Sequence, residues 1–583
     1  MVKIVMLGII VLLVIVFFLM SNWRFRSAVG SKLSKMPAAE NDIQVQQGVR
    51  ITTPDGIVLG ADLYRPKGDG RYPTIVTRTP YGRRFAAKGE AEYFARRGYN
   101  VLLQDVRGAG DSTGTFTPLS NEKRDGAATV EWVKTQPWFN GDIAIYGISY
   151  VGYTANAIAV QNDPSVKVLF SAISPRGFRD LIYTGGGLNL DTSLMWTSMV
   201  NELKKADYKM TLSLQLKMIP VMVQGMEGLK VPYDHLPFAN ADSEQNGTPI
   251  RNFQTFVQSA DPDAPYWRDS SLTEEEVAGI QVPVCLATSW HDIVLPDVLR
   301  NYETLSSMGK QPIISIGVGA HGNDKEQKRY RRLAKAWFDH HLKNMPLPIG
   351  DKRVQFNIIG TDEWIETESW PVRAKPLRFY LDSEGGLGPS APSADQSYSS
   401  YRYDPMEPTP AIGGLLFGSS KLVVDNAKLE ARDDTIFFTS RPFEEDTLVV
   451  GEINASIHFG SDVETSDLFI RANRVLTNGK SENFTDVVKR YFFDEADDGA
   501  VKATLAMPAT AIRFKKGERL RIVIASGAHP RIARNFGTGT TQEQASMVAG
   551  KSANIKVFHS AMMPSFIDLP IAEEARLYLT KRH

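Results

Sequence analysis

Hydrophobic residues recur between residues 72 and 320 in alternating strand-like and helix-like segments. The helix-like stretches include 86–98, 122–136 and 150–163. The apolar, β-rich runs are 72–82, 99–108, 142–149, 282–290 and 312–320. Strands that alternate with helices are typical of a parallel sheet covered by helices on both faces, so the pattern predicts the α/β class.

The sheet pattern is interrupted for more than a hundred residues. Within this gap, residues 190–229 have helical spacing, many Met residues and few strand signals. The interruption predicts a helical cap over 181–277, inserted between a first core segment (46–180) and a second one (278–348).

Short alternating runs separated by Gly, Asn, Asp and Pro begin near Arg353, and the first of them is "VQFNIIG". Period-two alternation in short segments is typical of an antiparallel sandwich. The pattern predicts an all-β domain over 349–583.

The N-terminal segment is much more hydrophobic than the rest of the chain. Residues 4–20 hold no charged or polar side chain, and Trp23, Arg24 and Arg26 follow them. Seventeen apolar residues just reach the length that crosses a bilayer as a helix. Residues 1–23 are therefore predicted to be a membrane anchor, with a cleaved signal segment as the alternative, and 24–45 a linker. The protein is either membrane-anchored or exported after cleavage, and the basic residues leave its side of the membrane open.

Composition excludes several function classes. Lys plus Arg and Asp plus Glu number 66 each, so no basic excess points to nucleic acid. The single cysteine, Cys285, excludes an intrachain disulfide and a cysteine-rich metal site. No metal or organic cofactor is predicted, and composition leaves the oligomeric state open.

Ser149 lies in the turn between a predicted strand and the predicted helix 150–163, with Gly147 and Gly152 beside it. Reactive groups of open α/β sheets collect at the carboxyl ends of strands. A tight turn there exposes the serine and leaves the Tyr150 amide at a helix N-terminus, where it can donate to an oxyanion. The turn predicts a nucleophile elbow, although its spacing, G-x-S-x-x-G, differs from the usual G-x-S-x-G.

A serine nucleophile needs a base and an acid at other strand ends. Asp292 follows the strand that ends near residue 290, and His321 follows the next strand and a Gly-rich turn. Serine, aspartate and histidine in this order are typical of α/β-hydrolases. Asp297 and Asp324 compete for the role of the acid, but strand-end position favours Asp292.

Tyr81 ends an earlier strand in the turn "RTPYG" and offers a second oxyanion donor, because a phenol stays protonated at neutral pH. A purely structural tyrosine in this turn is the alternative. The Gly-rich segment 104–116 is interpreted as a structural turn, since Asp111 would repel a phosphate.

The segments "RTPYG", "QDVRGAGDSTGTF", "GISYVG", "SWHD" and "GAHGND", in this order, resemble the cocaine esterase and X-Pro dipeptidyl-peptidase (S15) group of serine hydrolases. The resemblance covers the chain after about residue 45. It implies an α/β-hydrolase with a helical cap and a C-terminal jelly roll of the galactose-binding type. It also implies that Ser149, Asp292 and His321 are catalytic and that Tyr81 and Tyr150 hold the oxyanion, in an elbow that reads G-x-S-Y-x-G in the family.

The resemblance leaves the substrate open among small acyl esters, amides and short peptides. Dedicated X-Pro peptidases are implied to carry a sizeable additional N-terminal domain. We therefore expect an esterase or acylase first and a dipeptidyl peptidase second. A membrane-tethered, catalytically inactive binding protein is the third interpretation. The presence of Ser149, Asp292, His321 and Tyr81 together argues against it.

Overall fold

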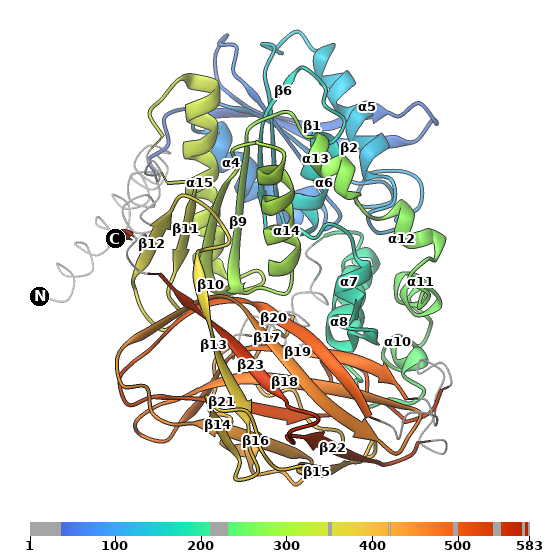
Figure 1. Ribbon diagram of the computed structural model, residues 1–583. Helices are drawn as coiled ribbons and strands as arrows, with labels where there is room; N and C mark the ends of the chain where they lie inside the picture. The colour runs from blue at the N-terminus through green and yellow to red at the C-terminus, as the bar shows by residue number, and fades with distance from the viewer. Residues whose placement is uncertain are drawn as a thin grey trace, which may run out of the picture.

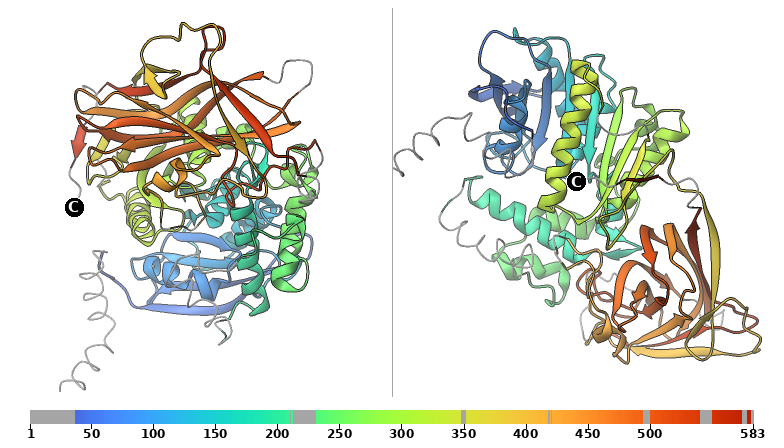
Figure 2. Two further views of the ribbon diagram at one scale, coloured as in Figure 1. Left: turned by 90° about the horizontal axis from the view of Figure 1, so that it is seen from below. Right: turned by 90° about the vertical axis from the view of Figure 1, so that its left-hand side faces the viewer.

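The computed structural model describes residues 37–209, 211, 231–347, 352–417, 419, 421–493, 500–539, 550–573 and 578–580. They form an α/β domain, a group of cap helices at one end of its sheet, and a C-terminal β domain (Figures 1 and 2). The cap helices and the β domain approach the α/β domain from the same end (Figure 1). The α/β class and the jelly-roll-like β domain predicted from the sequence are confirmed.

The sheet of the α/β domain has the strand order β1-β2-β4-β3-β5-β6-β9-β10-β11-β12-β24 within the described residues. Neighbours from β4 to β11 pair in parallel, whereas the strands at both edges pair antiparallel. The bounds are β1 Ile43–Thr52, β2 Val58–Pro66, β3 Thr74–Thr79, β4 Asn100–Asp105, β5 Ile143–Ile148, β6 Val166–Ala172, β9 Val284–His291, β10 Ile313–Ala320, β11 Val354–Asn357, β12 Trp364–Thr367 and β24 Tyr578–Thr580. Every residue of β3, β4 and β9 is buried, as expected of strands covered on both faces.

Helices cover both faces of this sheet (Figure 1). The first face carries α4 and α15, whose Phe94 and Phe338 rings lie 6.0 Å apart, and the second carries α5 and α6. The bounds are α3 Arg83–Ala86, α4 Lys88–Ala95, α5 Glu122–Lys134, α6 Tyr150–Ala159, α14 Leu295–Ser307 and α15 Asp324–Lys343. Cys285, on β9, is a buried free thiol.

Short helices and one long helix make up the insertion between β6 and β9. Helix α8 begins at Leu190 with an Asn189 cap, whose side chain accepts the Thr192 N–H at 3.1 Å. The elements are α7 Arg179–Ile182, β7 Tyr183–Thr184, β8 Gly187–Leu188, α8 Leu190–Lys205, η2 Phe238–Asn240, α10 Ala241–Asn246, α11 Arg251–Gln258, α12 Pro265–Asp269 and α13 Glu274–Gly279. Part of the Met-rich stretch lies outside the described residues.

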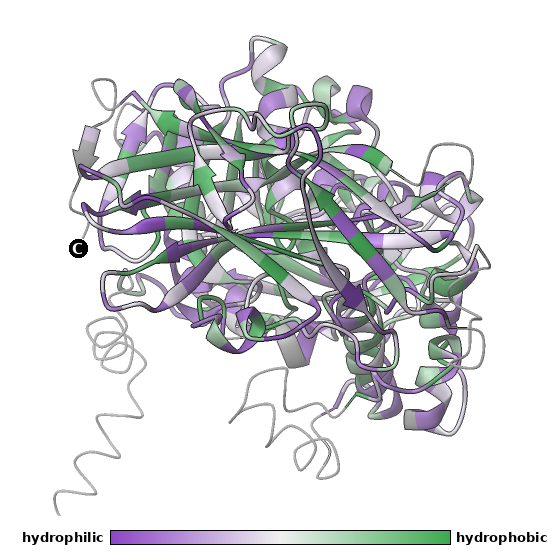
Figure 3. Cartoon of the chain, turned by 60° about the horizontal axis from the view of Figure 1, so that its bottom comes forward, coloured by the Kyte–Doolittle hydropathy of each residue, from purple (hydrophilic) through white to green (hydrophobic). Residues whose placement is uncertain are grey.

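The C-terminal domain is a mostly antiparallel sandwich with a core of its own, formed by residues such as Ile457, Ile522 and Leu569. Hydrophobic and hydrophilic residues alternate along several of its strands (Figure 3). The helix that the structure describes in this domain is α16 Ala427–Glu430. Its strands are β13 Ala374–Leu381, β14 Gly386–Gly388, β15 Tyr398–Tyr403, β16 Thr435–Ser440, β17 Thr447–Ser461, β18 Thr465–Val475, β19 Ser481–Phe492, β20 Ala500–Phe514, β21 Arg519–Ala525, β22 Ala553–Phe558 and β23 Phe566–Ala572.

The run "VQFNIIG" is not part of this sandwich, contrary to the sequence-based expectation. It contains β11, which pairs in parallel with β10 and extends the hydrolase sheet. All four residues of β11 are buried, because the strand lies inside the hydrolase sheet and not in a sheet with one face exposed to solvent. At the other end of the core, β1 begins at Ile43, inside the segment predicted as a linker.

The predicted anchor or signal segment, residues 1–23, lies outside the described residues, as does the linker up to residue 36. Among the helices that are described, none combines the length and the hydrophobicity needed to span a bilayer.

Candidate active site

Ser149 lies between β5 and α6 in a strained backbone conformation, with φ 62° and ψ −129°. Its N–H donates to the Ala172 carbonyl of β6 at 2.9 Å, which holds the turn against the sheet. A Cβ on Gly147 would lie 1.9 Å from the Val151 carbonyl oxygen, so only glycine fits there. The turn therefore has the geometry of a nucleophile elbow.

The structure brings His321 and Asp292 to this turn. His321 Nε2 lies 2.7 Å from Ser149 Oγ, and His321 Nδ1 lies 2.9 Å from Asp292 Oδ1. The two residues follow β9 and β10, which are parallel neighbours, so their loops emerge at the same edge of the sheet. Asp292 is 0 % exposed and the His321 side chain 9 %.

The competing acids do not reach the histidine. Asp297 Oδ2 accepts the Arg176 N–H at 2.8 Å, and Asp324 begins α15 at the surface. His291 is buried and contacts the Val318 carbonyl oxygen through Nδ1 at 3.1 Å. Ser149, His321 and Asp292 thus form one continuous chain of polar contacts, the arrangement in which a serine proton passes to an oriented imidazole.

Tyr81 and Tyr150 both line the cavity beside Ser149. Trp196 Nε1–H, from cap helix α8, donates to Tyr81 Oη at 3.1 Å. Because this bond occupies the phenol as an acceptor, the Tyr81 O–H is left to donate elsewhere. Burial raises the pKa of Tyr81 to about 12, although hydrogen bonds with Trp196 and Ser149 oppose the rise, so the phenol keeps its proton. The Tyr150 N–H is in the first turn of α6, where helix geometry supplies no acceptor.

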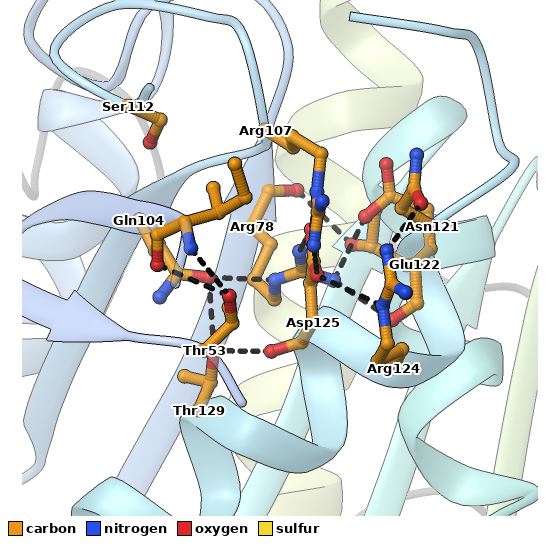
Figure 4. A network of polar contacts seen from close by, with 12 residues as sticks. Thr53, Arg78, Gln104, Arg107, Ser112, Asn121, Glu122, Arg124, Asp125 and Thr129 are labelled. Atoms are coloured by element: carbon orange, nitrogen blue, oxygen red, sulfur yellow. Dashed lines mark hydrogen bonds and ion pairs between the residues drawn. The ribbon is translucent and has the colours of Figure 1, made fainter. Parts of the chain in front are cut away.

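A buried polar network binds the side chain of Tyr150. The Tyr150 O–H donates to Glu122 Oε1 at 2.8 Å, and Glu122 Oε2 forms an ion pair with Arg78 at 2.8 Å. Arg78 Nε also donates to Gln104 at 2.7 Å, and Figure 4 shows Arg78 between Gln104, Glu122 and Asp125. Through Glu122, this network anchors the first residue of α6 to β3 and β4.

The cavity beside Ser149 has a volume of about 20 Å³ and mostly apolar walls. Phe178 and Trp196 line it from the cap. Phe417 lines it from the β domain, and the centroid of its ring lies 5.6 Å from that of the His321 ring. The Phe417 N–H donates to Asp191 Oδ2 of the cap at 2.7 Å, which joins the two elements over the site. Sequence reasoning missed Trp196 and Phe417, because no motif marks side chains that reach the site from the cap and from the β domain.

Comparison with family models gives two consecutive matches. Residues 55–323 match the X-Pro dipeptidyl-peptidase (S15 family) model, and residues 350–567 match the X-Pro dipeptidyl-peptidase C-terminal non-catalytic domain. The chain belongs to the S15 family of serine hydrolases. The resemblance seen in the sequence is thereby confirmed. The first model covers most of the α/β-hydrolase domain with its cap, and the second covers most of the C-terminal β domain.

Similar proteins span almost the whole chain. Cocaine esterase from Rhodococcus sp. (strain MB1 Bresler) is 24% identical over 576 residues, which cover 91% of this chain and 99% of the esterase. Among solved structures, an aminopeptidase from a marine sediment archaeon (Thaumarchaeota archaeon) matches with a TM-score of 0.77 and 20% identity, covering 91% of this chain and 97% of its own. An α-amino acid ester hydrolase matches with a TM-score of 0.75 and 19% identity, covering 92% and 98%. These structural matches show that the fold is shared.

Proposed function

We propose that this S15-family protein hydrolyses small acyl esters or amides through an acyl-enzyme on Ser149. The observation that carries the proposal is the contact chain from Ser149 Oγ through His321 to Asp292. With the Nδ1 proton donated to Asp292, Nε2 accepts the Ser149 proton while Oγ attacks the carbonyl carbon. His321 then gives this proton to the departing alcohol or amine.

The second half-reaction repeats the first with water in place of the serine. His321 removes a proton from water, the resulting hydroxide attacks the acyl carbon, and the proton returns to Ser149 as the acid leaves. In both halves the oxyanion lies where the Tyr150 N–H and the Tyr81 O–H donate. Neither step requires a redox group or a bound metal.

Esters come before X-Pro amides in the proposal. The small apolar cavity beside Ser149 favours a short, uncharged acyl group. No carboxylate lines this cavity to receive the free amine of an X-Pro dipeptide, among the residues that the structure describes. Cocaine esterase and the α-amino acid ester hydrolase are both named for ester substrates, which supports the same order.

The test compares 4-nitrophenyl acetate with Gly-Pro-4-nitroanilide, using the Ser149→Ala variant to subtract other hydrolysis. We expect Ser149-dependent turnover of the acetate and a much lower kcat/KM for the anilide. A preference for the anilide would make the protein a dipeptidyl peptidase. Turnover of neither substrate, together with binding of a polysaccharide, would favour the inactive binding protein.

Removing the phenol of Tyr81 tests the oxyanion site. Tyr81→Phe is expected to lower kcat about 10²- to 10³-fold with little change in KM, because one oxyanion donor is lost. Trp196→Phe keeps an aromatic ring at this position but removes the N–H that donates to Tyr81, so a smaller loss, about tenfold, is expected from one neutral hydrogen bond.

Tyr398→Phe, at an exposed position of β15 in the β domain, is the matched control and should leave both constants unchanged. Initial rates on 4-nitrophenyl acetate give kcat and KM for all three variants. A Tyr81→Phe enzyme with wild-type kcat would exclude the phenol as an oxyanion donor.

We also propose that residues 4–20 anchor the protein in a membrane, with export after cleavage as the alternative. It is supported by their uninterrupted apolar sequence and by the Trp and Arg residues that follow them. Fractionation of cells, followed by N-terminal sequencing of the mature protein, separates the two.

A further inference from the structure

A second cavity, of about 150 Å³, lies next to the cavity beside Ser149. Leu181 of the cap and Ile293 of the loop after β9 line both cavities, so these two side chains form their common wall. The second cavity reaches into the β domain, where Val488 and Arg531 line it. Its volume equals that of an engineered protein cavity that binds benzene.

Asp486 and Arg531 line this cavity, and together with Arg471 behind them they form a buried cluster with a net positive charge. Asp486 on β19 is paired with Arg531 and, at 2.8 Å, with Arg471 on β18. Burial opposes ionisation of Asp486, but the two guanidinium groups outweigh it and hold the pKa of this carboxyl below its usual value. Two cations and one anion therefore leave one positive charge that no group of the cluster balances.

Arg531 is the member of this cluster that has donors to spare. Only 4 % of it is exposed, and Nη1 donates to Asp486 Oδ1. Among the residues that the structure describes, neither Nε nor Nη2 of Arg531 has a hydrogen-bond acceptor. The Arg471 guanidinium, by contrast, is used up by Asp486, Asn426 and the carbonyl groups of residues 412 and 413.

The remaining charged group at the cavity wall is Asp180. Its carboxylate contacts Arg179 at 2.8 Å and Arg300 at 3.6 Å, so it is already balanced by surface cations. The cavity thus combines apolar walls, space for a ring, and a buried guanidinium with free donors. A carboxylate on a small apolar body matches these three properties, because a guanidinium binds carboxylates in a bidentate manner.

We propose that this cavity receives the leaving group of the substrate and that Arg531 binds a carboxylate on it. The inference rests on the proposed ester hydrolysis at Ser149 and names its substrate class: small acyl esters of hydroxy acids, or amides of amino acids. The acyl group lies in the small cavity beside Ser149, and the carboxylate-bearing half passes Leu181 and Ile293 into the second cavity.

Three phenyl acetates that differ in charge test this assignment on the full-length protein. They are 4-acetoxybenzoate (anionic), its methyl ester (neutral) and 3-acetoxyphenyltrimethylammonium (cationic). Each kcat/KM is divided by the rate at which hydroxide hydrolyses the same ester, which removes differences in intrinsic reactivity. The variants are Arg531→Gln, Arg531→Lys and, as a control on an exposed position of the same domain, Arg519→Gln.

The wild type and Arg519→Gln are expected to prefer the anionic ester to the neutral one. Arg531→Gln should lower this preference about tenfold or more, the size expected for a charge-assisted hydrogen bond, because kcat/KM for the anionic ester falls more than kcat/KM for the neutral ester. Arg531→Lys keeps a cation beside Asp486 and should retain part of the preference. An unchanged preference in Arg531→Gln, or a preference for the cationic ester, would overturn the assignment.

Failure of this inference and failure of the proposed function give different results. If Ser149 is needed for hydrolysis of the neutral ester but the Arg531 variants behave like the wild type, the carboxylate site is wrong and the proposed hydrolase function is still supported. Absence of any Ser149-dependent hydrolysis removes the hydrolase. In that case, or if Arg531→Gln does not fold, calorimetric titration with 4-hydroxybenzoate decides: binding that is weakened in Arg531→Lys supports the site, and no binding to the wild type overturns it.

Discussion

Ser149→Ala is expected to lower kcat for 4-nitrophenyl acetate about 10⁶-fold, the loss seen when a triad serine is removed from a serine hydrolase. The residue that is lost is the only nucleophile in contact with His321 Nε2 among the described residues. Folding should be unaffected, because alanine removes one hydroxyl at the surface of a cavity. Steady-state rates and circular dichroism spectra check both statements.

Ser307→Ala is the matched control for this variant. Ser307 ends α14 at the surface, and within the described part of the chain its hydroxyl donates only to the Thr304 carbonyl, so wild-type rates are expected. If Ser149→Ala kept a substantial part of the wild-type kcat, hydrolysis would take place at another group and the proposed mechanism would be wrong.

Asp292→Asn is expected to lower kcat about 10⁴-fold, the size reported for the same change in a serine protease triad. Asparagine keeps the shape of the side chain. Its amide, however, can donate to Nδ1 of His321, which would place the imidazole proton on Nε2 and prevent it from accepting the Ser149 proton. Because Asp292 is completely buried, neither water nor a dissolved ion can take the place of the lost carboxylate.

Asp324→Asn provides the control for the acid, since sequence reasoning placed both residues among the candidates. Asp324 lies at the start of α15 and makes no contact with His321, so its variant should keep the wild-type kcat. Equal losses in the two variants, or a larger loss in Asp324→Asn, would move the role of the acid away from Asp292. Rates on 4-nitrophenyl acetate at saturating concentration give the comparison.

The parallel core of the hydrolase domain was predictable because its strands are buried on both faces. Apolar runs such as 142–149 therefore stand out from the amphipathic helices beside them. The meeting of Ser149, Asp292 and His321 was also predictable, because parallel strands end at a common edge and each residue follows a strand. The interruption of the sheet pattern predicted the helical cap, period-two alternation predicted the β sandwich, and the family resemblance added its jelly-roll type.

Other features depend on pairing between distant segments, which local patterns do not encode. The short strand β11 alternates apolar and polar residues like a sandwich strand, yet it pairs in parallel with β10 and is buried in the hydrolase sheet. Trp196 and Phe417 reach the site from the cap and the β domain, and their roles follow from packing across three parts of the chain. The spare donors of Arg531 likewise become visible only once Asp486 and Arg471 are placed beside it.

The central claim is that His321 and Asp292 activate Ser149 as a nucleophile. Fluorophosphonate labelling of the full-length protein in detergent, followed by mass spectrometry of the modified peptide, tests it most directly. We predict a single adduct on Ser149, absent in Ser149→Ala and strongly slowed in Asp292→Asn. A folded protein that takes no label, or takes it at another serine in preference to Ser149, would contradict the account.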